Sequence, residues 1–409
     1  MTSQFEFFDL CVILVVFGNQ KTHKRKNSMV NLLNSELKVK LSGFKNLTQM
    51  ELFRDIDESM GALDRRQTDF INYYSLVSDS LPGLTRPRGP AGRPPSSRRS
   101  ILKLFFIKAF LNIPTTKAAH SFVKSSRSWR RICGFESPRE VPSEATLSRA
   151  FAEFSRDGAV AAIHSGVIMR HMKDTMTVIH DVSGDSTKIE ARERGVRKGK
   201  AAQGQAARTP RKRGRKAREE KRDTPPPGPS RLELQATRTL AENLAEIPRA
   251  CDWGCKIGSK GRPEHWRGYK LHIGATDCGV VTSALLSSAS LHDSQAAIPL
   301  MQMTEANTYF HFYDLFDAAY DSRHIGDFSR SHGHVPIIDP NSRGNGGREL
   351  DPASREHYKC RTAVERVNSE LKDSYGARHV MVRGAAKVFT HLMFGVVIVT
   401  VKHLISMLC

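Results

Sequence analysis

Along residues 358–372, apolar and polar positions repeat with the period of an α-helix. At about 100° per residue, four polar side chains lie within about 60° of one another on one face. They are Tyr358, Arg361, Glu365 and Lys372. The opposite face is an apolar stripe made of Cys360, Val364, Val367 and Leu371. We therefore predict one amphipathic helix whose polar face is either an ordinary solvated surface with an i, i+4 ion pair or an organised functional surface.

The hydrophobic pattern from residue 177 onward predicts alternating strands and helices. Strands are predicted at residues 177–191, at 268–290 as two strands with a turn at 277–279, at 308–317 and at 334–339. Helices are predicted at residues 292–303, 322–330, around Glu365 and at 388–408. Three antiparallel strands followed by βαβ crossovers resemble an RNase H-like domain. The predicted fold is therefore α/β, an RNase H-like mixed sheet flanked by helices, over residues 176–409.

The N-terminal half is predicted to be helical. Residues 101–113 form a strongly apolar helical run, and residues 142–154 begin with a Pro-Ser cap. We predict a helical domain at residues 100–175, for which DNA binding and oligomerisation are equally compatible functions. It follows a helical region with a Pro/Arg-rich linker at residues 29–99. Residues 1–28 differ in texture from the rest, and we treat them as a doubtful extension with Met29 as an alternative start.

The net charge of the chain indicates what kind of molecule it binds. The chain has 63 Lys and Arg against 42 Asp and Glu, a net charge of +21, which favours a polyanion such as nucleic acid. Residues 192–222 alone hold fourteen Lys or Arg and three Glu, a net charge of +11. We predict a disordered basic insertion at about 194–232 that contacts DNA phosphates, against the alternative of a solvated linker.

The cysteines and the apolar runs indicate the cellular compartment of the protein and whether it enters a membrane. Seven scattered cysteines indicate a reducing compartment rather than a disulfide scaffold. Cys251 and Cys255 are the one close pair, and without a second pair we assign no metal to them. The run at residues 5–18 is short and contains acidic residues, and the run at 388–408 contains His391, Lys402 and His403. We expect a buried closing helix, no membrane partner, and a cytoplasmic, nucleoid-associated protein.

Three carboxylates are candidates for chemistry. Asp185 lies in the first predicted strand, Asp317 ends the fourth, and Glu365 lies on the polar helix face. Carboxylates at strand ends and on an adjacent helix converge at one edge of such a sheet, where they repel one another unless cations intervene. Hard oxygen ligands favour Mg²⁺ or Mn²⁺, and two such ions about 4 Å apart support in-line phosphoryl transfer on a phosphodiester.

The pattern Tyr, two residues, Arg, three, Glu, six, Lys at residues 358–372 resembles the signature of one branch of the DDE transposases of bacterial insertion sequences. The stretches DSTKIEARE, GYKLHIGATDCGVVTSALLSSASLHDS and DAAYDS are similar to other blocks of this family. The resemblance covers residues from about 142 to the C-terminus. It implies that Asp185, Asp317 and Glu365 are catalytic metal ligands and that Tyr358, Arg361 and Lys372 bind DNA phosphates.

Other polar residues are weaker candidates. Asp181 shares a strand face with Asp185, which we prefer because the family block begins there. Asp321 and Asp293 are candidates for a supporting role behind the metal ligands. Lys270 and His272 alternate along a strand and either face DNA or are ordinary half-exposed residues.

The expected function is that of a DNA transposase. It would bind the terminal inverted repeats of its element and target DNA as a homodimer, and catalyse metal-dependent strand cleavage and transfer. The alternatives are a catalytically inactive transposase-derived DNA-binding protein and an RNase H-like nuclease. Relatives of this branch often carry a β-rich insertion between the second Asp and the Glu, but only 48 positions separate Asp317 from Glu365 here. A hairpin intermediate that depends on such an insertion is therefore open to question.

Overall fold

The computed structural model describes residues 63–81, 96–194, 228–257, 261–341 and 349–408. Within these ranges, the chain up to Leu404 belongs to one compact unit, Ala62–Leu404. Three predicted segments lie outside the described residues: the extension at 1–28, most of the region at 29–99 and most of the basic insertion. The described chain resumes shortly before Arg231, where α9 begins.

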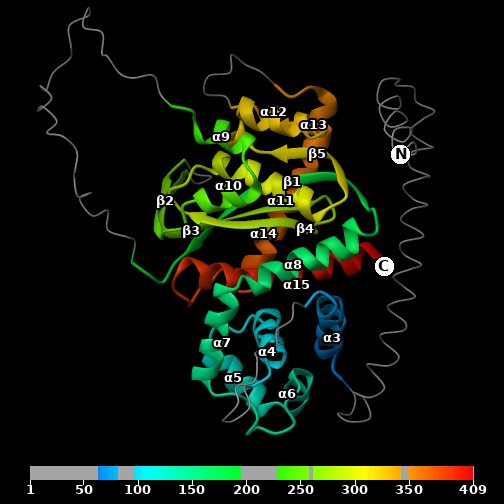
Figure 1. Cartoon of the computed structure of the whole chain (residues 1–409), viewed down its shortest axis with the longest axis vertical. Coiled ribbons are helices and arrows are strands. Elements are labelled where there is room, and N and C mark those ends of the chain that lie inside the picture. Colours follow the sequence, from blue (N-terminus) through cyan, green and yellow to red (C-terminus); the bar gives the residue numbers. More distant parts are fainter. Residues whose placement is uncertain (1–62, 82–95, 195–227, 258–260, 342–348, 409) are drawn as a thin grey trace, which may run out of the picture. The chain divides into compact units, whose positions relative to one another are not determined.

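A six-stranded sheet forms the centre of the C-terminal part (Figure 1). Its strands are β1 Val178–Glu190, β2 Asp252–Ile257, β3 Pro263–Thr276, β4 Val281–Ser288, β5 Phe310–Phe316 and β6 Val335–Ile338. β1 and β4 both pair antiparallel with β3, whereas β5 pairs parallel with β1 and β6 pairs parallel with β5. The predicted order of three antiparallel strands followed by two parallel crossovers is confirmed. The sheet and its helices have an RNase H-like arrangement.

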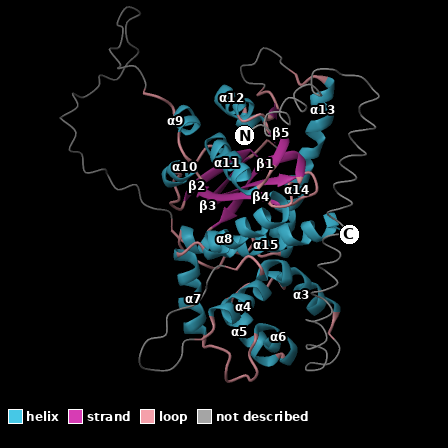
Figure 2. Ribbon diagram, turned by 45° about the vertical axis from the view of Figure 1, so that its right-hand side comes forward, coloured by secondary structure: helices cyan, strands magenta, loops and turns pink. Residues whose placement is uncertain are grey.

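Helices cover both faces of the sheet (Figure 2). Gly184 of β1 faces the ring of Phe316, which packs with Ala297 and Met301 of α11. The next residue, Asp185, accepts a hydrogen bond from Asn368 of α14. Because successive strand residues point to opposite faces, α11 and α14 lie on opposite faces of β1. The helices after the first strand are α9 Arg231–Thr237, α10 Leu240–Glu246, α11 Ala297–Asn307, α12 Arg323–Ser331, α13 Pro352–Tyr358, α14 Thr362–Ser374 and α15 Ala385–Leu408.

The part that precedes β1 is helical, as predicted. Its helices are α3 Arg65–Ser78, α4 Arg98–Phe110, α5 Thr116–Ser125, α6 Arg127–Cys133, α7 Glu144–Arg156 and α8 Ala159–Ile168, with a π-helical turn at Met169–Lys173. Ser143 caps α7 as the sequence indicates, with its hydroxyl accepting from the N–H of Thr146. Ser97 caps α4, so this helix begins inside the predicted linker. Arg98 in its first turn pairs with Glu153 of α7 at 2.8 Å.

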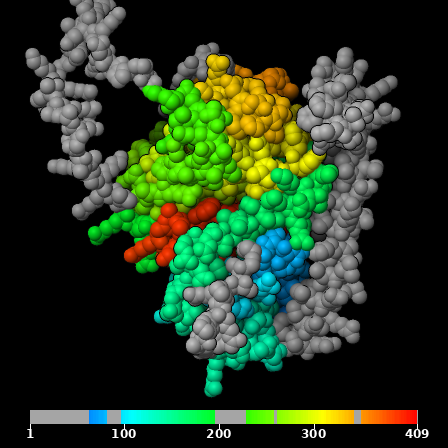
Figure 3. Space-filling view, in the orientation of Figure 1, coloured from blue at the N-terminus to red at the C-terminus, as the bar shows by residue number. Residues whose placement is uncertain are grey.

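The closing helix α15 is mostly buried, which confirms that prediction. Among the described residues it is the one helix long and apolar enough to span a membrane, and 78% of that stretch is buried inside the protein. In the space-filling view of Figure 3, red atoms near the C-terminus show only in a narrow strip between green and cyan ones. His391 hydrogen bonds to the carbonyl of Gly376, and Lys402 and His403 both pair with Glu370 of α14. The three polar residues that interrupt the apolar run therefore all form contacts with other parts of the protein.

Two features differ from the sequence prediction, and a third, the short segment between Asp317 and Glu365, agrees with it. The single helix predicted at residues 358–372 is α13, a 3₁₀ turn at Lys359–Arg361 and α14. The strand β2, which pairs with the first half of β3, was not predicted, nor were α9 and α10. Between Asp317 and Glu365 the described residues hold α12, β6, α13 and two short 3₁₀ turns, so no β-rich insertion is present in this part of the described chain.

Candidate active site

Two of the candidate carboxylates lie on neighbouring parallel strands. β1 and β5 are in register with Ser183 opposite Leu315, so Asp185 and Asp317, each two residues further on, reach the same edge of the sheet. β5 ends at Phe316, and the carboxylate of Asp317 then caps a 3₁₀ turn, Ala318–Tyr320, by accepting from the N–H of Ala319 at 3.0 Å. This cap fixes the position of the Asp317 backbone.

The third carboxylate, Glu365, lies in the first turn of α14. The apolar face of this helix, Val364, Val367 and Leu371, is fully buried, as the hydrophobic pattern predicts. The side chain of Glu365 is 54% exposed, compared with 18% for Asp185 and 35% for Asp317. The three acids therefore range from nearly buried to solvent-accessible.

The guanidinium of Arg361 holds the three carboxylates around one positive charge. Its Nη2 lies 3.6 Å from Oδ1 of Asp185 and 3.6 Å from Oδ2 of Asp317, and its Nη1 donates to Oε1 of Glu365 at 2.5 Å. Only the pair with Glu365 follows from helical spacing. The other two contacts depend on the packing of α14 across the sheet. The structure thus brings the three predicted acids together and places a cation between them.

The pKa values of Asp185 and Asp317 are raised, as expected for carboxylates that lie close together in a partly buried site. Burial raises the pKa of Asp185 to about 6, opposed by Arg361 and reinforced by the negative charge of Asp317. Burial also raises the pKa of Asp317, again opposed by Arg361. Asp185 and Asp317 are therefore costly to ionise without a cation, and their oxygen donors fit a hard divalent metal ion. Arg361 occupies the region where such a charge is needed.

Two further residues contribute to this site and were missed by the sequence analysis. The amide of Asn368, one turn beyond Glu365, donates to Oδ2 of Asp185 at 2.9 Å and so orients that carboxylate. The hydroxyl of Tyr320 is buried without a hydrogen-bond partner among the described residues. Burial raises its pKa, and the nearby negative charges of Asp293, Asp185 and Asp317 raise it further. The helical spacing from Glu365 to Asn368 and the DAAYDS block were the available signals.

The predicted DNA-binding side chains lie at different places around the carboxylates. Tyr358 ends α13, and the Arg361 guanidinium lies over its ring at 5.9 Å from the centroid. Lys372 lies further along α14. Burial lowers the pKa of Lys372, and the positive charges of Lys188 and Lys256 lower it further. These lysines from β1, β2 and α14 form a group of positive charges beside the acids.

The two supporting candidates differ in their contacts. Asp293 pairs with Lys270 at 2.9 Å, in a short 3₁₀ turn at Asp293–Ala296 close to the turn that Asp317 caps. Asp321 accepts a hydrogen bond from the backbone N–H of Asn341 at 2.9 Å, which ties it to the chain after β6. Asp293 thus lies behind the carboxylates, whereas this hydrogen bond of Asp321 serves a loop.

The suggestion that Lys270 and His272 face DNA is wrong. Lys270 is largely buried against Asp293 and the carbonyl of Leu291. His272 is fully buried and hydrogen bonds to Ser287 at 2.8 Å, and burial lowers its pKa to about 4. Both side chains lie on the face of β3 that α11 and the 3₁₀ turn at Asp293–Ala296 cover.

Two stretches of the chain match known families. Residues 240–401 match the transposase DDE domain. Residues 59–153, which include α3 to most of α7, match a transposase domain of the DUF772 type. No significant match was found among curated proteins or among solved structures. The two matched stretches correspond to the sheet with its C-terminal helices and to the N-terminal helical part.

Proposed function

We propose, from the premise that the chain belongs to the DDE-type insertion-sequence transposases, that it cuts DNA at the ends of its element and joins the freed 3′ end to target DNA. The observation that carries this proposal is the set of three carboxylates from β1, the end of β5 and α14 around Arg361. The spacing of Tyr358, Arg361, Glu365 and Lys372 supports placing it in the Tyr-Arg-Glu-Lys branch, and we propose that it acts on double-stranded DNA as a homodimer.

Asp185, Asp317 and Glu365 are proposed to hold the divalent metal ions that this family uses, here two Mg²⁺ or Mn²⁺. When bound, such ions activate a water or 3′-OH for attack and stabilise the leaving oxygen of the phosphodiester. Asn368 keeps the Asp185 carboxylate turned toward the site through its 2.9 Å hydrogen bond. The exposed side of the site at Glu365 gives DNA access to it.

Arg361 is proposed to act in two states. Without metal ions its guanidinium neutralises the three acids. If metal ions were bound, they would neutralise the carboxylates instead, and the guanidinium would be available to grip a backbone phosphate, for which its planar fork is suited. Tyr358 stacks on this guanidinium and limits its positions, while Lys372, Lys188 and Lys256 supply charge along the DNA path.

The test is cleavage of a labelled duplex that carries the element's end and flanking DNA, with the full chain and Mg²⁺ or Mn²⁺. We expect cuts at the junction that are lost on chelation and in Glu365→Gln, with end binding retained. The matched control is Glu356→Gln, which removes the same charge from an exposed side chain on α13. A Glu365→Gln variant that still cuts would refute the site assignment.

The same experiment separates the two alternative functions. Tight binding of the end without any cut, under all metal conditions, would favour a DNA-binding protein derived from a transposase. Cutting of unrelated duplexes without preference for the end, and without strand joining, would favour a nuclease.

A further inference from the structure

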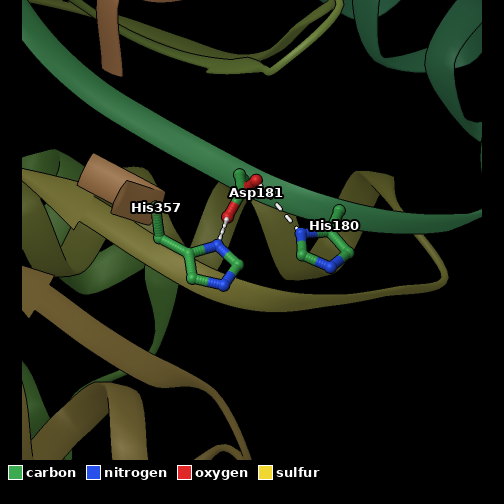
Figure 4. Close-up of side chains that lie close together, drawn as sticks. All are labelled: His180, Asp181 and His357. Atoms are coloured by element: carbon green, nitrogen blue, oxygen red, sulfur yellow. Dashed lines mark hydrogen bonds and ion pairs between the residues drawn. The ribbon is translucent and has the colours of Figure 1, made fainter. Parts of the chain in front are cut away.

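A second group of side chains of the kind that bind metal ions comes from β1 and α13, and its β1 members precede Asp185 by four and five residues (Figure 4). It consists of His180, Asp181 and His357, hereafter the His–Asp–His cluster. Nδ1 of His180 lies 3.1 Å from Oδ2 of Asp181, and Nδ1 of His357 lies 3.6 Å from Oδ1. The ligand atoms all lie within 4.8 Å of one another.

The central carboxylate of the cluster lacks a permanent positive partner. Asp181 is 2% exposed, and apart from the Cys360 thiol beside this carboxylate, its Oδ1 has no hydrogen-bond partner among the residues that the structure describes. Its ion-pair contacts in that part of the chain are the two imidazoles, which carry charge only when protonated. Burying a carboxylate without a compensating charge is costly, so the site favours a bound cation.

The two imidazoles are held in place by ring stacking. The His357 ring stacks on Tyr313 with centroids 4.4 Å apart, and it is nearly parallel to the ring of His180 at 5.4 Å. Figure 4 shows the Asp181 carboxylate between the two rings, each of which directs a nitrogen toward it. Cys360, one turn after His357, also lies next to Asp181, whose charge adds to burial in raising the pKa of the thiol. The two rings and the carboxylate are therefore held close together even when no metal ion is bound.

We propose that the His–Asp–His cluster is a transition-metal site, best suited to Zn²⁺, bound through the two imidazole nitrogens and the Asp181 carboxylate. Ligand atoms on one tetrahedral zinc ion lie about 3.4 Å apart, given zinc–ligand distances of about 2.0–2.1 Å. The observed 3.1 Å and 3.6 Å contacts run to different oxygens of Asp181, and the ligand atoms lie within 4.8 Å of one another, so binding one ion requires the two rings and the carboxylate to turn toward a common point. Imidazole ligands favour Zn²⁺ over Mg²⁺, so this site and the all-oxygen carboxylate site select different ions.

A metal ion at this place would fasten two elements that carry the proposed active site. His180 and Asp181 lie on β1 shortly before Asp185, and His357 lies on α13, which leads through the 3₁₀ turn into α14 and Glu365. The bound ion would hold the start of this helical segment against β1. This role is structural and goes beyond the proposed DNA chemistry, because it does not depend on whether the chain cuts DNA.

The test measures metal binding rather than activity. The full chain with Asp185→Asn, which weakens the carboxylate site, is titrated with Co²⁺ as a spectroscopic substitute for Zn²⁺, and bound Zn²⁺ per chain is counted after gel filtration. We expect one equivalent and the visible absorption of a tetrahedral ion. His357→Gln in the same background should weaken binding at least about 100-fold, since even the loss of a group that only supports a ligand costs about 10–100-fold.

The matched control is His292→Gln, which removes an exposed histidine outside the cluster and should leave binding unchanged. If His357→Gln fails to fold, His180→Gln serves instead, because its side chain is 56% exposed. Zn²⁺ should also raise the melting temperature of the parent, which here is the Asp185→Asn chain. It should not raise that of the same chain with His357→Gln or His180→Gln. Equal binding by the parent and a folded cluster variant, or no bound metal in the parent, would overturn the proposal.

Discussion

Arg361 is the residue on which the candidate site depends most. Sequence spacing alone gives it one acidic neighbour, Glu365, four positions on. The folded chain adds Asp185 and Asp317 at 3.6 Å each. An arginine among three acids explains how these carboxylates coexist without metal ions, and its position beside them is compatible with its proposed role in binding a phosphate.

The Asp185 carboxyl predicts a pH-dependent stability. Burial raises its folded-state pKa to about 6 from the usual 3.8, so the folded chain holds this proton more tightly than the unfolded chain. The loss of folding stability caused by ionising this carboxyl is therefore absent below pH about 4 and complete above pH about 6. In metal-free buffer at pH 8, Asp185→Asn should therefore be more stable than the parent by about 3 kcal/mol, because the pKa rises from 3.8 to about 6 and a tenfold change in proton affinity corresponds to about 1.4 kcal/mol.

Denaturant titrations in EDTA at pH 4 and pH 8 measure this difference. It should shrink toward zero at pH 4, where the carboxyl is largely protonated in the folded chain and the cost of ionising it has nearly gone. Adding Mg²⁺ at pH 8 should stabilise the parent and not the variant. An Asp185→Asn chain that is less stable than the parent at pH 8 would show that the carboxylate is not strained in the metal-free fold.

The acids of the site were predictable, whereas their surroundings were not. Asp317 and Glu365 follow from a strand end and a helix face, which are local patterns, and Asp185 was preferred to Asp181 because a block that resembles the family begins there. Asn368 and Lys256 act through contacts between elements distant in sequence, and no local pattern indicates which strand or helix meets which. The interpretation of His272 failed for the same reason, because its burial depends on the packing of α11 and the turn before it on that face of the sheet.

At the scale of elements, the sequence predicted that these segments are helical but did not predict where a helix is broken. The polar face at residues 358–372 is built from α13, a 3₁₀ turn and α14. Periodicity measures the average repeat and does not detect one tightened turn. β2 escaped prediction because its residues, DWGCKI, show no clean alternation and include a glycine. Its pairing with β3 supplies the regularity that its own sequence lacks.

β1 depends on a glycine directly before the first acid. A Cβ at Gly184 would overlap the ring of Phe316, the last residue of β5. Gly184→Ala should therefore push β1 and β5 apart next to Asp185 and Asp317, at a cost of about 1–3 kcal/mol for overpacking. Thermal unfolding measures the loss, and in a DNA cleavage assay the activity should fall with it.

The control for this prediction is Gly228→Ala, at a glycine with open space around its Cβ, which should be close to neutral. Phe316→Leu, which shortens the opposing side chain, should recover part of the loss in the double variant. A Gly184→Ala chain as stable as the parent would mean that the two strands adjust without strain.

At the scale of the whole molecule, α15 joins the two halves of the chain. Glu370 of α14 pairs with Lys402 and His403 on one side of this helix. His164 of α8 hydrogen bonds to Thr400 at 3.1 Å, and the ring of Phe394 packs with Phe105 and Phe106 of α4. The helix that closes the sheet domain in sequence thus also completes the core of the N-terminal helices.

This sharing predicts how the chain unfolds. Phe394→Ala removes a side chain that is 2% exposed and should cost about 3–5 kcal/mol. Because both halves rest on α15, they should lose stability together and melt in one transition. Phe312→Ala, at a residue that is 41% exposed, is the control of matched chemistry and should cost far less.

Two tryptophans allow the halves to be followed separately. Trp129 is buried in α6 and Trp266 is buried in β3. In chains from which Trp253 and one of these two have been removed, guanidinium unfolding followed by fluorescence should give the same midpoint, shifted equally by Phe394→Ala. Two different midpoints would instead support the division predicted from sequence, with residues 100–175 and 176–409 folding as separate domains. The outcome decides whether the N-terminal helices can move independently of the carboxylate site when DNA binds.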